Sequence, residues 1–206
     1  MKQLLVLLFL FAGINIANAQ FAENNAIYLS GEIGGGNYFN SDLSFNYIYQ
    51  DSYSIKIGYS GNLRKAKSQP EDYFSGLVKT IFMFGLANPK DELENYHISL
   101  GKIVNLNKRK NIRANILVGV GYTIIEEPEN WQKIESNIID GLMMDNYIWN
   151  YGKRHGISLI INPKIEFPFT RHWGLTVSPM VQLNKDRTYF GIGVGSMLGL
   201  LKGKNN

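Results

Sequence analysis

Residues 53–63 read YSIKIGYSGNL and decide the fold, because apolar and polar side chains alternate along the whole stretch. One face carries Tyr53, Ile55, Ile57, Tyr59 and Leu63, and the other carries Ser54, Lys56, Gly58, Ser60 and Asn62. Successive side chains of a β-strand point to opposite faces, so this period of two predicts a strand. A tilted strand needs about 9–11 residues to cross a bilayer, whereas strands of soluble proteins more often have about five or six.

The same alternation recurs along the chain and predicts an all-β protein. The eight stretches cover about 26–38, 43–50, 53–63, 95–105, 112–125, 156–167, 173–184 and 188–200. Their less apolar face is mostly Gly, Ser, Asn and Thr, which suits the interior of a narrow barrel. The apolar face then points to lipid. We therefore expect an eight-stranded antiparallel up-and-down transmembrane β-barrel.

The composition narrows the function classes. Of the 206 residues only 18% are charged, against a usual value of about 25%, while 13% are aromatic and 21 are Gly. Cys is absent, which excludes disulfides, thiolate metal sites and a Cys nucleophile. The net charge of +4 is mild and is not gathered into a basic cluster, so we expect no nucleic-acid partner.

The first residues predict export. Met1-Lys2 is a short basic region, residues 4–12 read LLVLLFLFA, and Ala17-Asn18-Ala19 has the small-x-small pattern of a signal peptidase site. The apolar run is too short for a transmembrane helix, which needs about 20 residues. We expect residues 1–19 to be a cleaved signal peptide and residues 20–206 to form one barrel domain in the bacterial outer membrane.

The connections alternate in length. Short ones follow the second, fourth and sixth stretches, while long ones cover about 64–94 and 126–155. Since membrane barrels have short periplasmic turns and long extracellular loops, the long segments, and the short ones at 39–42 and 185–187, are expected outside. Residues 72–86 are apolar enough for an amphipathic helix or an extra hairpin, and we favour the helix. The apolar side chains of 126–155 predict either packing over the barrel mouth or a partner site.

The closing part of the chain resembles a known family. Residues 177–184 read VSPMVQLN and residues 189–195 read YFGIGVG. With the signal peptide and the eight stretches, they resemble the OmpA/OmpX-like outer membrane protein β-barrels. The resemblance implies contact with outer-membrane lipid and lipopolysaccharide, assembly by the barrel assembly machinery and a monomeric state. Such barrels usually end on an aromatic residue, whereas this chain ends LLKGKNN at 200–206.

Charged residues on the predicted inward face are the main candidate site. They are Glu32, Lys56, Arg113, Lys164 and Glu166. Buried charges must be paired, so we expect a lumen salt-bridge network that plugs the barrel. A gated pore is the alternative, although eight strands leave little channel.

His97 and Ser99 are the enzymatic candidates. Outer-membrane lipid A deacylases use a His and a Ser two residues apart on one strand face, with an acidic partner. Here the pair lies on the polar face, and the 112–125 stretch contains no acidic residue, so we expect no catalysis.

Metal and cofactor signals are weak. His97, His155 and His172 share no metal-ligand spacing. The carboxylates at 92–94 and 126–129 are expected to be solvated loop charges, with loose divalent-cation binding as the alternative. Residues 34–36 are GGG without a following Lys-Ser/Thr, so they form no phosphate loop. We expect no cofactor.

These observations predict an integral outer-membrane barrel with a structural or surface-interaction role. One alternative is a lipid-modifying enzyme. The other is a soluble exported barrel of the lipocalin type, which requires an apolar lumen and a polar exterior.

Overall fold

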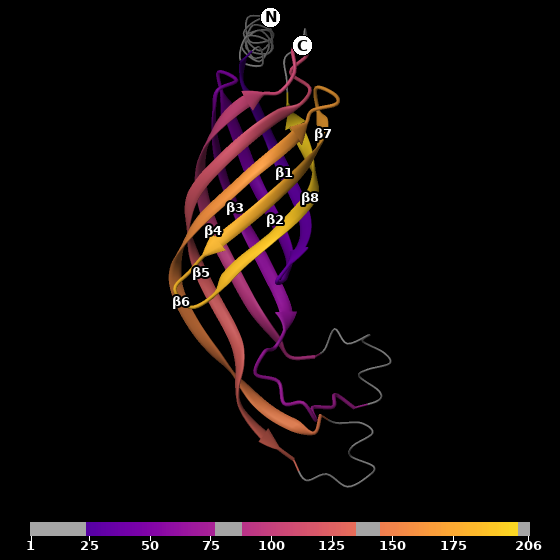
Figure 1. The fold of residues 1–206 in the computed structure, drawn as a ribbon, viewed down its shortest axis with the longest axis vertical. Helices are drawn as coiled ribbons and strands as arrows, with labels where there is room; N and C mark the ends of the chain where they lie inside the picture. Colours follow the sequence, from indigo (N-terminus) through magenta and orange to yellow (C-terminus); the bar gives the residue numbers. More distant parts are fainter. Residues whose placement is uncertain (1–23, 77–87, 135–144, 202–206) are drawn as a thin grey trace, which may run out of the picture.

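The computed structural model describes residues 24–76, 88–134 and 145–201, and these residues form eight antiparallel strands in one closed barrel. Each strand pairs with its sequence neighbours, and β1 pairs with β8 to close the ring (Figure 1). The strands are β1 (Ala26–Gly36), β2 (Phe39–Tyr49), β3 (Tyr53–Lys65), β4 (Lys90–Asn105), β5 (Arg113–Lys133), β6 (Tyr147–Phe167), β7 (Trp173–Leu183) and β8 (Thr188–Leu200). The predicted eight-stranded up-and-down barrel is confirmed.

Apolar side chains cover the outside of the barrel. On β3 the outward Ile57 is 54% exposed, whereas the inward Lys56 is 2% exposed. β2 and β3 pair from Phe39↔Leu63 to Tyr49↔Tyr53, so the outward apolar residues of both strands form one surface. A soluble lipocalin-type barrel needs the opposite polarity, so that alternative is wrong.

The two ends of the barrel differ in their connections. Residues 50–52, 106–112 and 168–172 form short turns at one end, while β3 and β5 end, and β4 and β6 begin, at the other (Figure 1). In the β2–β3 turn Gln50 and Asp51 both have positive φ, the conformation of the tight turn that matches strand twist. Because outer-membrane barrels place short turns in the periplasm, we call the two ends periplasmic and extracellular.

Four strand bounds differ from the prediction by four residues or more, all at the extracellular end. β2 begins four residues before position 43 and β4 five before position 95, while β5 ends at Lys133 and β6 begins at Tyr147. The predicted external loop at 39–42 and large parts of 64–94 and 126–155 are therefore strand. The polarity of the two faces inverts there: on β4 the charged Glu94 lies outside and Leu93 is buried inside. Alternation with lipid-facing apolar residues stops where the outer face meets water.

Two earlier predictions fall mostly on residues that the structure leaves undescribed. The signal peptide at 1–19 lies outside the described residues and stays a prediction. The same holds for most of the helix expected over 72–86, since 77–87 are not described; residues 66–76 form turns and irregular chain. None of the helices in the described part of the chain is long and apolar enough to cross a membrane.

The lumen is layered along the barrel axis. An apolar layer closes the periplasmic end and comprises Ala26, Tyr28, Ile48, Ile103, Met197 and Leu201. A second apolar layer near the extracellular end comprises Tyr38, Leu93, Ile125, Ile160, Met180 and Tyr189. Buried Ser, Asn, Thr and charged side chains fill the space between them. Sequence alternation did not predict the apolar layers, because they break the rule that inward residues are polar.

Candidate functional site

Aromatic side chains mark the two edges of the lipid-facing band. Near the extracellular edge the rings of Tyr59 and Tyr96 lie 5.1 Å apart, and the Tyr59 hydroxyl donates to Glu94 at 2.9 Å. Near the periplasmic edge the Lys102 ammonium lies 4.2 Å from the Tyr53 ring centre, and Trp173 packs against Phe169. Aromatic rings with a polar edge prefer the membrane interface, so the apolar surface between the two girdles faces the bilayer.

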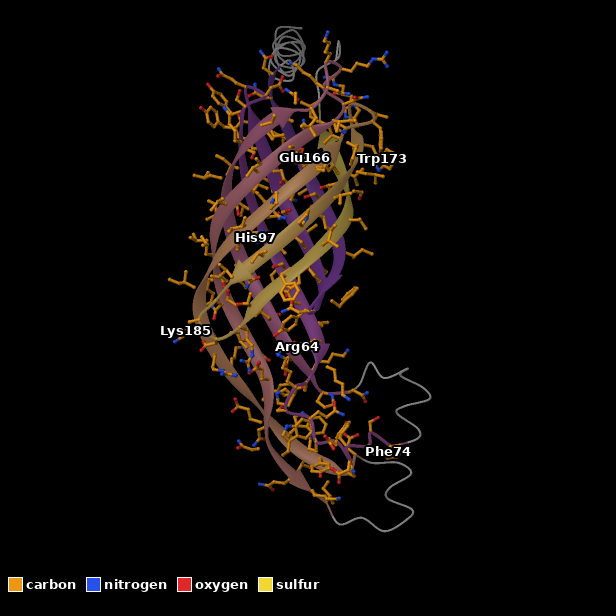
Figure 2. The ribbon with its side chains drawn as sticks, viewed as in Figure 1. Arg64, Phe74, His97, Glu166, Trp173 and Lys185 are labelled. Carbon is orange, nitrogen blue, oxygen red and sulfur yellow. The ribbon has the colours of Figure 1, made fainter. Side chains whose placement is uncertain are left out.

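The first lumen cluster surrounds Glu166 near the periplasmic end (Figure 2). The Arg113 guanidinium donates to one carboxylate oxygen at 2.6 Å. The Tyr28 hydroxyl and the Asn115 amide donate to the other oxygen at 2.7 and 3.0 Å. Arg113 also donates to the backbone oxygen of Leu201 at 3.0 Å, which ties the end of the described chain to the lumen. The carboxylate has three donors, as a buried charge requires.

The second lumen cluster lies in the middle of the barrel. The Lys56 ammonium donates to Asp42 at 3.1 Å and to the Asn162 side-chain oxygen at 3.1 Å. Lys164 forms a buried ion pair with Glu32, which also accepts a hydrogen bond from Ser178. Each positive charge therefore has a carboxylate from a different strand, so the pairs connect β2 with β3 and β1 with β6.

All five residues proposed from the sequence point into the lumen and are at most 6% exposed. In the structure Arg113 forms an ion pair with Glu166, and Lys164 forms one with Glu32. The partner of Lys56 is Asp42, which sequence analysis missed because it placed 39–42 in an external loop. That assignment was wrong; Asp42 follows the inward parity of Ser44 and Asn46, and this signal was available in the sequence.

His97 and Ser99 lie inside the barrel rather than on its lipid face. They are 4% and 2% exposed, so they are shielded from lipid and solvent alike. His97 Nε2 is 3.4 Å from Asp42 Oδ2, which supplies the acidic neighbour that the sequence did not reveal.

A third charged cluster lies on the extracellular side of the second apolar layer. Arg64 stacks 4.2 Å above the Tyr38 ring and forms an ion pair with Asp91 at 2.7 Å (Figure 2). Glu127 accepts hydrogen bonds from Arg154 and Arg187, and the bond to Glu127 raises the pKa of Arg187. Glu127 was expected as a solvated loop charge; it is instead a 5% exposed residue of β5. The cluster caps the lumen.

Above this cap the chain forms what we call the extracellular extension, residues 66–76, 127–134 and 145–155. At its centre are four aromatic rings, which come from all three of these segments: Tyr73, Trp131, Tyr147 and Trp149. The rings of Trp131 and Trp149 are 5.2 Å apart, and Tyr73 lies 5.7 Å from Trp131 and 5.9 Å from Trp149. The apolar character of 72–86 and 126–155 was evident from the sequence, but the contact between the two segments was not.

Hydrogen bonds fix residues 66–76 against the β5–β6 hairpin. The Ser68 hydroxyl donates to the Pro128 oxygen at 2.6 Å. The Tyr147 hydroxyl donates to Asp72 at 2.7 Å, and Lys133 forms an ion pair with the same carboxylate. These bonds from Lys133 and Tyr147 lower the pKa of Asp72. The extension is thus an ordered unit rather than separate loops.

Among the described residues, no group of three or more His, Asp or Glu side chains is arranged so that it could hold a metal ion. Two of the carboxylates expected as solvated loop charges have partners on neighbouring strands: Glu94 accepts from the Tyr59 hydroxyl, and Glu126 pairs with Lys153.

The sequence matches no family model and no curated protein. Among solved structures it is similar to Ail, the attachment invasion locus protein of Yersinia pestis, with a TM-score of 0.51, 10% identity and coverage of 85% of this chain and 98% of that chain. It is also similar to the N-terminal β-barrel domain of Pseudomonas aeruginosa OprF (TM-score 0.47, 11% identity, 85% and 97% covered). A third likeness is to Neisserial surface protein A (TM-score 0.45, 8% identity, 85% and 96% covered).

The likeness to Ail shows a shared fold, the eight-stranded outer-membrane β-barrel. The apolar band between two aromatic girdles makes this chain a membrane-spanning barrel of that type.

Proposed function

We propose that the chain is a non-catalytic, non-conducting outer-membrane barrel that holds the extracellular extension at the cell surface as a binding surface for protein partners. The observation that carries this proposal is the ordered aromatic group on strands that continue beyond the lipid-facing band. The lumen and the extension then have separate tasks, anchoring and contact.

The lumen supports an anchoring task. Apolar layers at both ends contain large side chains such as Tyr28 and Tyr189, which are 2% and 1% exposed. Between them the charged side chains are paired with one another. A pore needs a continuous water path, whereas a narrow eight-stranded barrel is filled by its side chains. These features favour a plug over a channel.

The extension supports a contact task. Its surface exposes Ile148 at 54%, Tyr151 at 49% and Phe74 at 41%. Figure 2 shows Phe74 at the extracellular end of the molecule. Tyr and Trp are enriched among the residues that dominate protein–protein binding energy. A rigid aromatic surface also loses little conformational entropy on binding.

A free strand edge adds a backbone component. The ladder between β6 and β7 begins at Leu159↔Leu183, so within the described residues the stretch 147–156 has no partner strand on its β7 side. Unpaired backbone groups at an edge can accept an extended segment of another protein. The proposed partner is therefore a protein that offers an extended segment with apolar side chains.

The test uses the barrel in lipid nanodiscs and a phage-displayed library of random peptides. We expect selected peptides to bind the wild-type barrel and to lose about tenfold or more in affinity for the Trp131→Ala/Trp149→Ala variant, since such anchors often contribute over 1 kcal/mol each. Bound peptide should also slow amide exchange along residues 147–151. Trp173→Phe, at the periplasmic end, is the matched control and should bind as the wild type does.

Selection of no peptide, or of peptides that bind the double variant equally well, would contradict the contact task. Steady conductance of the wild-type barrel in a planar bilayer would contradict the plug. The two measurements are independent, so each part of the proposal can fail alone.

A further inference from the structure

A groove of about 730 Å³ opens on the lipid-facing surface where β6, β7, β8 and β1 adjoin. Its floor is low because two small residues face each other there, Gly31 on β1 and Ser196 on β8. A Cβ added to Gly31 would meet nothing within 4 Å, so the space above it is open. The groove is thus a gap in an otherwise bulky apolar surface.

The walls are apolar and one of them is aromatic. Phe167 and Phe169 stack with their rings 6.3 Å apart and line the groove beside Val177 and Val194. Phe169 lies in the periplasmic β6–β7 turn, while Ile33 and Val194 lie further along the barrel. The groove therefore starts at the periplasmic rim and runs into the bilayer.

The occupant follows from the place of the groove. It opens to the hydrocarbon layer, where no water is available to fill it, and an apolar gap left empty forfeits dispersion contacts on every wall. A hydrocarbon chain matches the shape and polarity of a long apolar gap. A second barrel would have to insert a ridge, whereas lipid is present on this surface at all times.

The charge of the periplasmic rim indicates the headgroup. The described residues of the three periplasmic turns include Lys108, Arg109, Lys110 and Arg171, against the single acid Asp51. Asp51 is paired with Lys110 at 2.8 Å. Arg171 follows Phe169 by two residues in the turn at the mouth of the groove. Basic residues at a membrane surface attract anionic lipids.

We propose that this groove binds one acyl chain of an anionic phospholipid of the periplasmic leaflet, with the lipid phosphate at Arg171. The site does not depend on the contact task of the extension. It would fix one lipid at the junction of the first and last strands, where the barrel closes.

Trp173 is a built-in reporter, because its ring packs 5.5 Å from Phe169 and its side chain is 42% exposed. The Trp131→Phe/Trp149→Phe background leaves it as the only tryptophan of the three. This protein is reconstituted in phosphatidylcholine with increasing fractions of phosphatidylglycerol brominated on its acyl chains, which quench a nearby indole. Phosphatidylcholine brominated in the same way is the zwitterionic probe.

We expect brominated phosphatidylglycerol to quench Trp173 at about a fivefold lower mole fraction than brominated phosphatidylcholine, the ratio expected for one basic side chain beside an anionic lipid. The Arg171→Gln variant should remove this preference. The Gly31→Leu/Ser196→Leu variant, which fills the groove, should reduce quenching to the level set by mole fraction. Gly35→Leu, an equally open outward position on β1, should keep the preference.

Heat-modifiable gel migration of every variant shows that the barrel has folded. Quenching of the wild type in strict proportion to mole fraction for both lipids would overturn the site. Equal quenching by both lipids above that proportion, unchanged in Arg171→Gln, would overturn the anionic headgroup. Quenching that survives in the filled variant would overturn the groove as its location.

Discussion

Ion pairs occur both in the lumen and in the extracellular extension, but their exposure to solvent differs. In the lumen, Arg113 and Glu166 are 2.6 Å apart with side chains only 5% and 1% exposed. In the extracellular extension, Lys133 and Asp72 are paired with side chains 61% and 53% exposed. A buried charge that loses its partner cannot recover hydration, whereas an exposed one can. Loss of a lumen pair is therefore expected to lower the stability of the whole barrel, whereas loss of the exposed pair should affect only the local order of the extension.

The two regions also use apolar side chains in opposite ways. Within the lipid-facing band apolar residues lie outside and charges inside, while on β4 beyond the band Glu94 lies outside and Leu93 inside. One strand can serve both regions because its alternation continues while the solvent changes from lipid to water.

The largest loss of unfolding free energy is expected from Glu166→Gln. The change leaves the Arg113 guanidinium buried without a carboxylate, and breaking a buried pair costs about 3–5 kcal/mol. Urea unfolding of the barrel refolded in detergent micelles measures this loss. The matched control is Glu129→Gln in the extension, whose side chain is 49% exposed and which should change stability by about 1 kcal/mol or less. Equal losses in both variants would break the comparison.

A smaller loss of barrel stability is expected from Gly58→Ala, which tests how tightly the lumen is packed. The added Cβ would lie 2.7 Å from the Ser44 Cβ, 2.8 Å from His97 Nε2 and 2.9 Å from the Leu43 oxygen. Overpacking of this kind costs about 1–3 kcal/mol. Gly35→Ala, whose new Cβ meets nothing within 4 Å, is the control and should unfold with the wild type. A stable Gly58→Ala variant would indicate a loosely filled lumen.

Trp131→Ala should loosen the extension and leave the barrel unchanged. The variant loses ring contacts with Trp149, Tyr73 and Tyr147 and the hydrogen bond to Ser68. Aromatic pairs contribute about 0.5–1.5 kcal/mol each, so the loss of three should make local opening at least about tenfold more frequent. Limited proteolysis of the extension measures this, and the urea midpoint of the barrel should stay the same. A shifted midpoint would show that the two regions unfold as one.

The barrel could be predicted from the sequence because lipid requires apolar side chains on the outer face, and this alternation is visible within each strand separately. The alternation at 53–63 identifies Ile57 as outward and Lys56 as inward without reference to any other strand. The same alternation elsewhere in the chain identified every strand of the fold. The inward parity likewise named five of the lumen charges, although it was not applied to Asp42. Prediction failed at the extracellular ends of β2, β4, β5 and β6, because polar or charged outward residues there resemble a loop.

Pairings between strands were beyond the sequence. Asp42 and Lys56 lie on neighbouring strands, but the Glu32–Lys164 pair joins residues 132 positions apart across the lumen. The contact between Tyr73 and the two tryptophans depends on residues 66–76 folding against the β5–β6 hairpin. Such contacts follow from barrel closure and shear, which no single stretch encodes.

The smallest effect is expected from the pH dependence of Asp72. Its hydrogen bonds from Lys133 and Tyr147 lower the pKa of the carboxyl group, so its contribution is complete above the ordinary carboxyl range and is lost as the pH falls through the lowered value. In a Trp173→Phe background, fluorescence of Trp131 and Trp149 should change slightly on acidification, and Asp72→Asn should flatten that change at its low-pH level. Glu71→Gln, the neighbouring exposed carboxylate, should keep it. An acid transition that persists unaltered in Asp72→Asn would show that the lumen, rather than the extension, responds to acid.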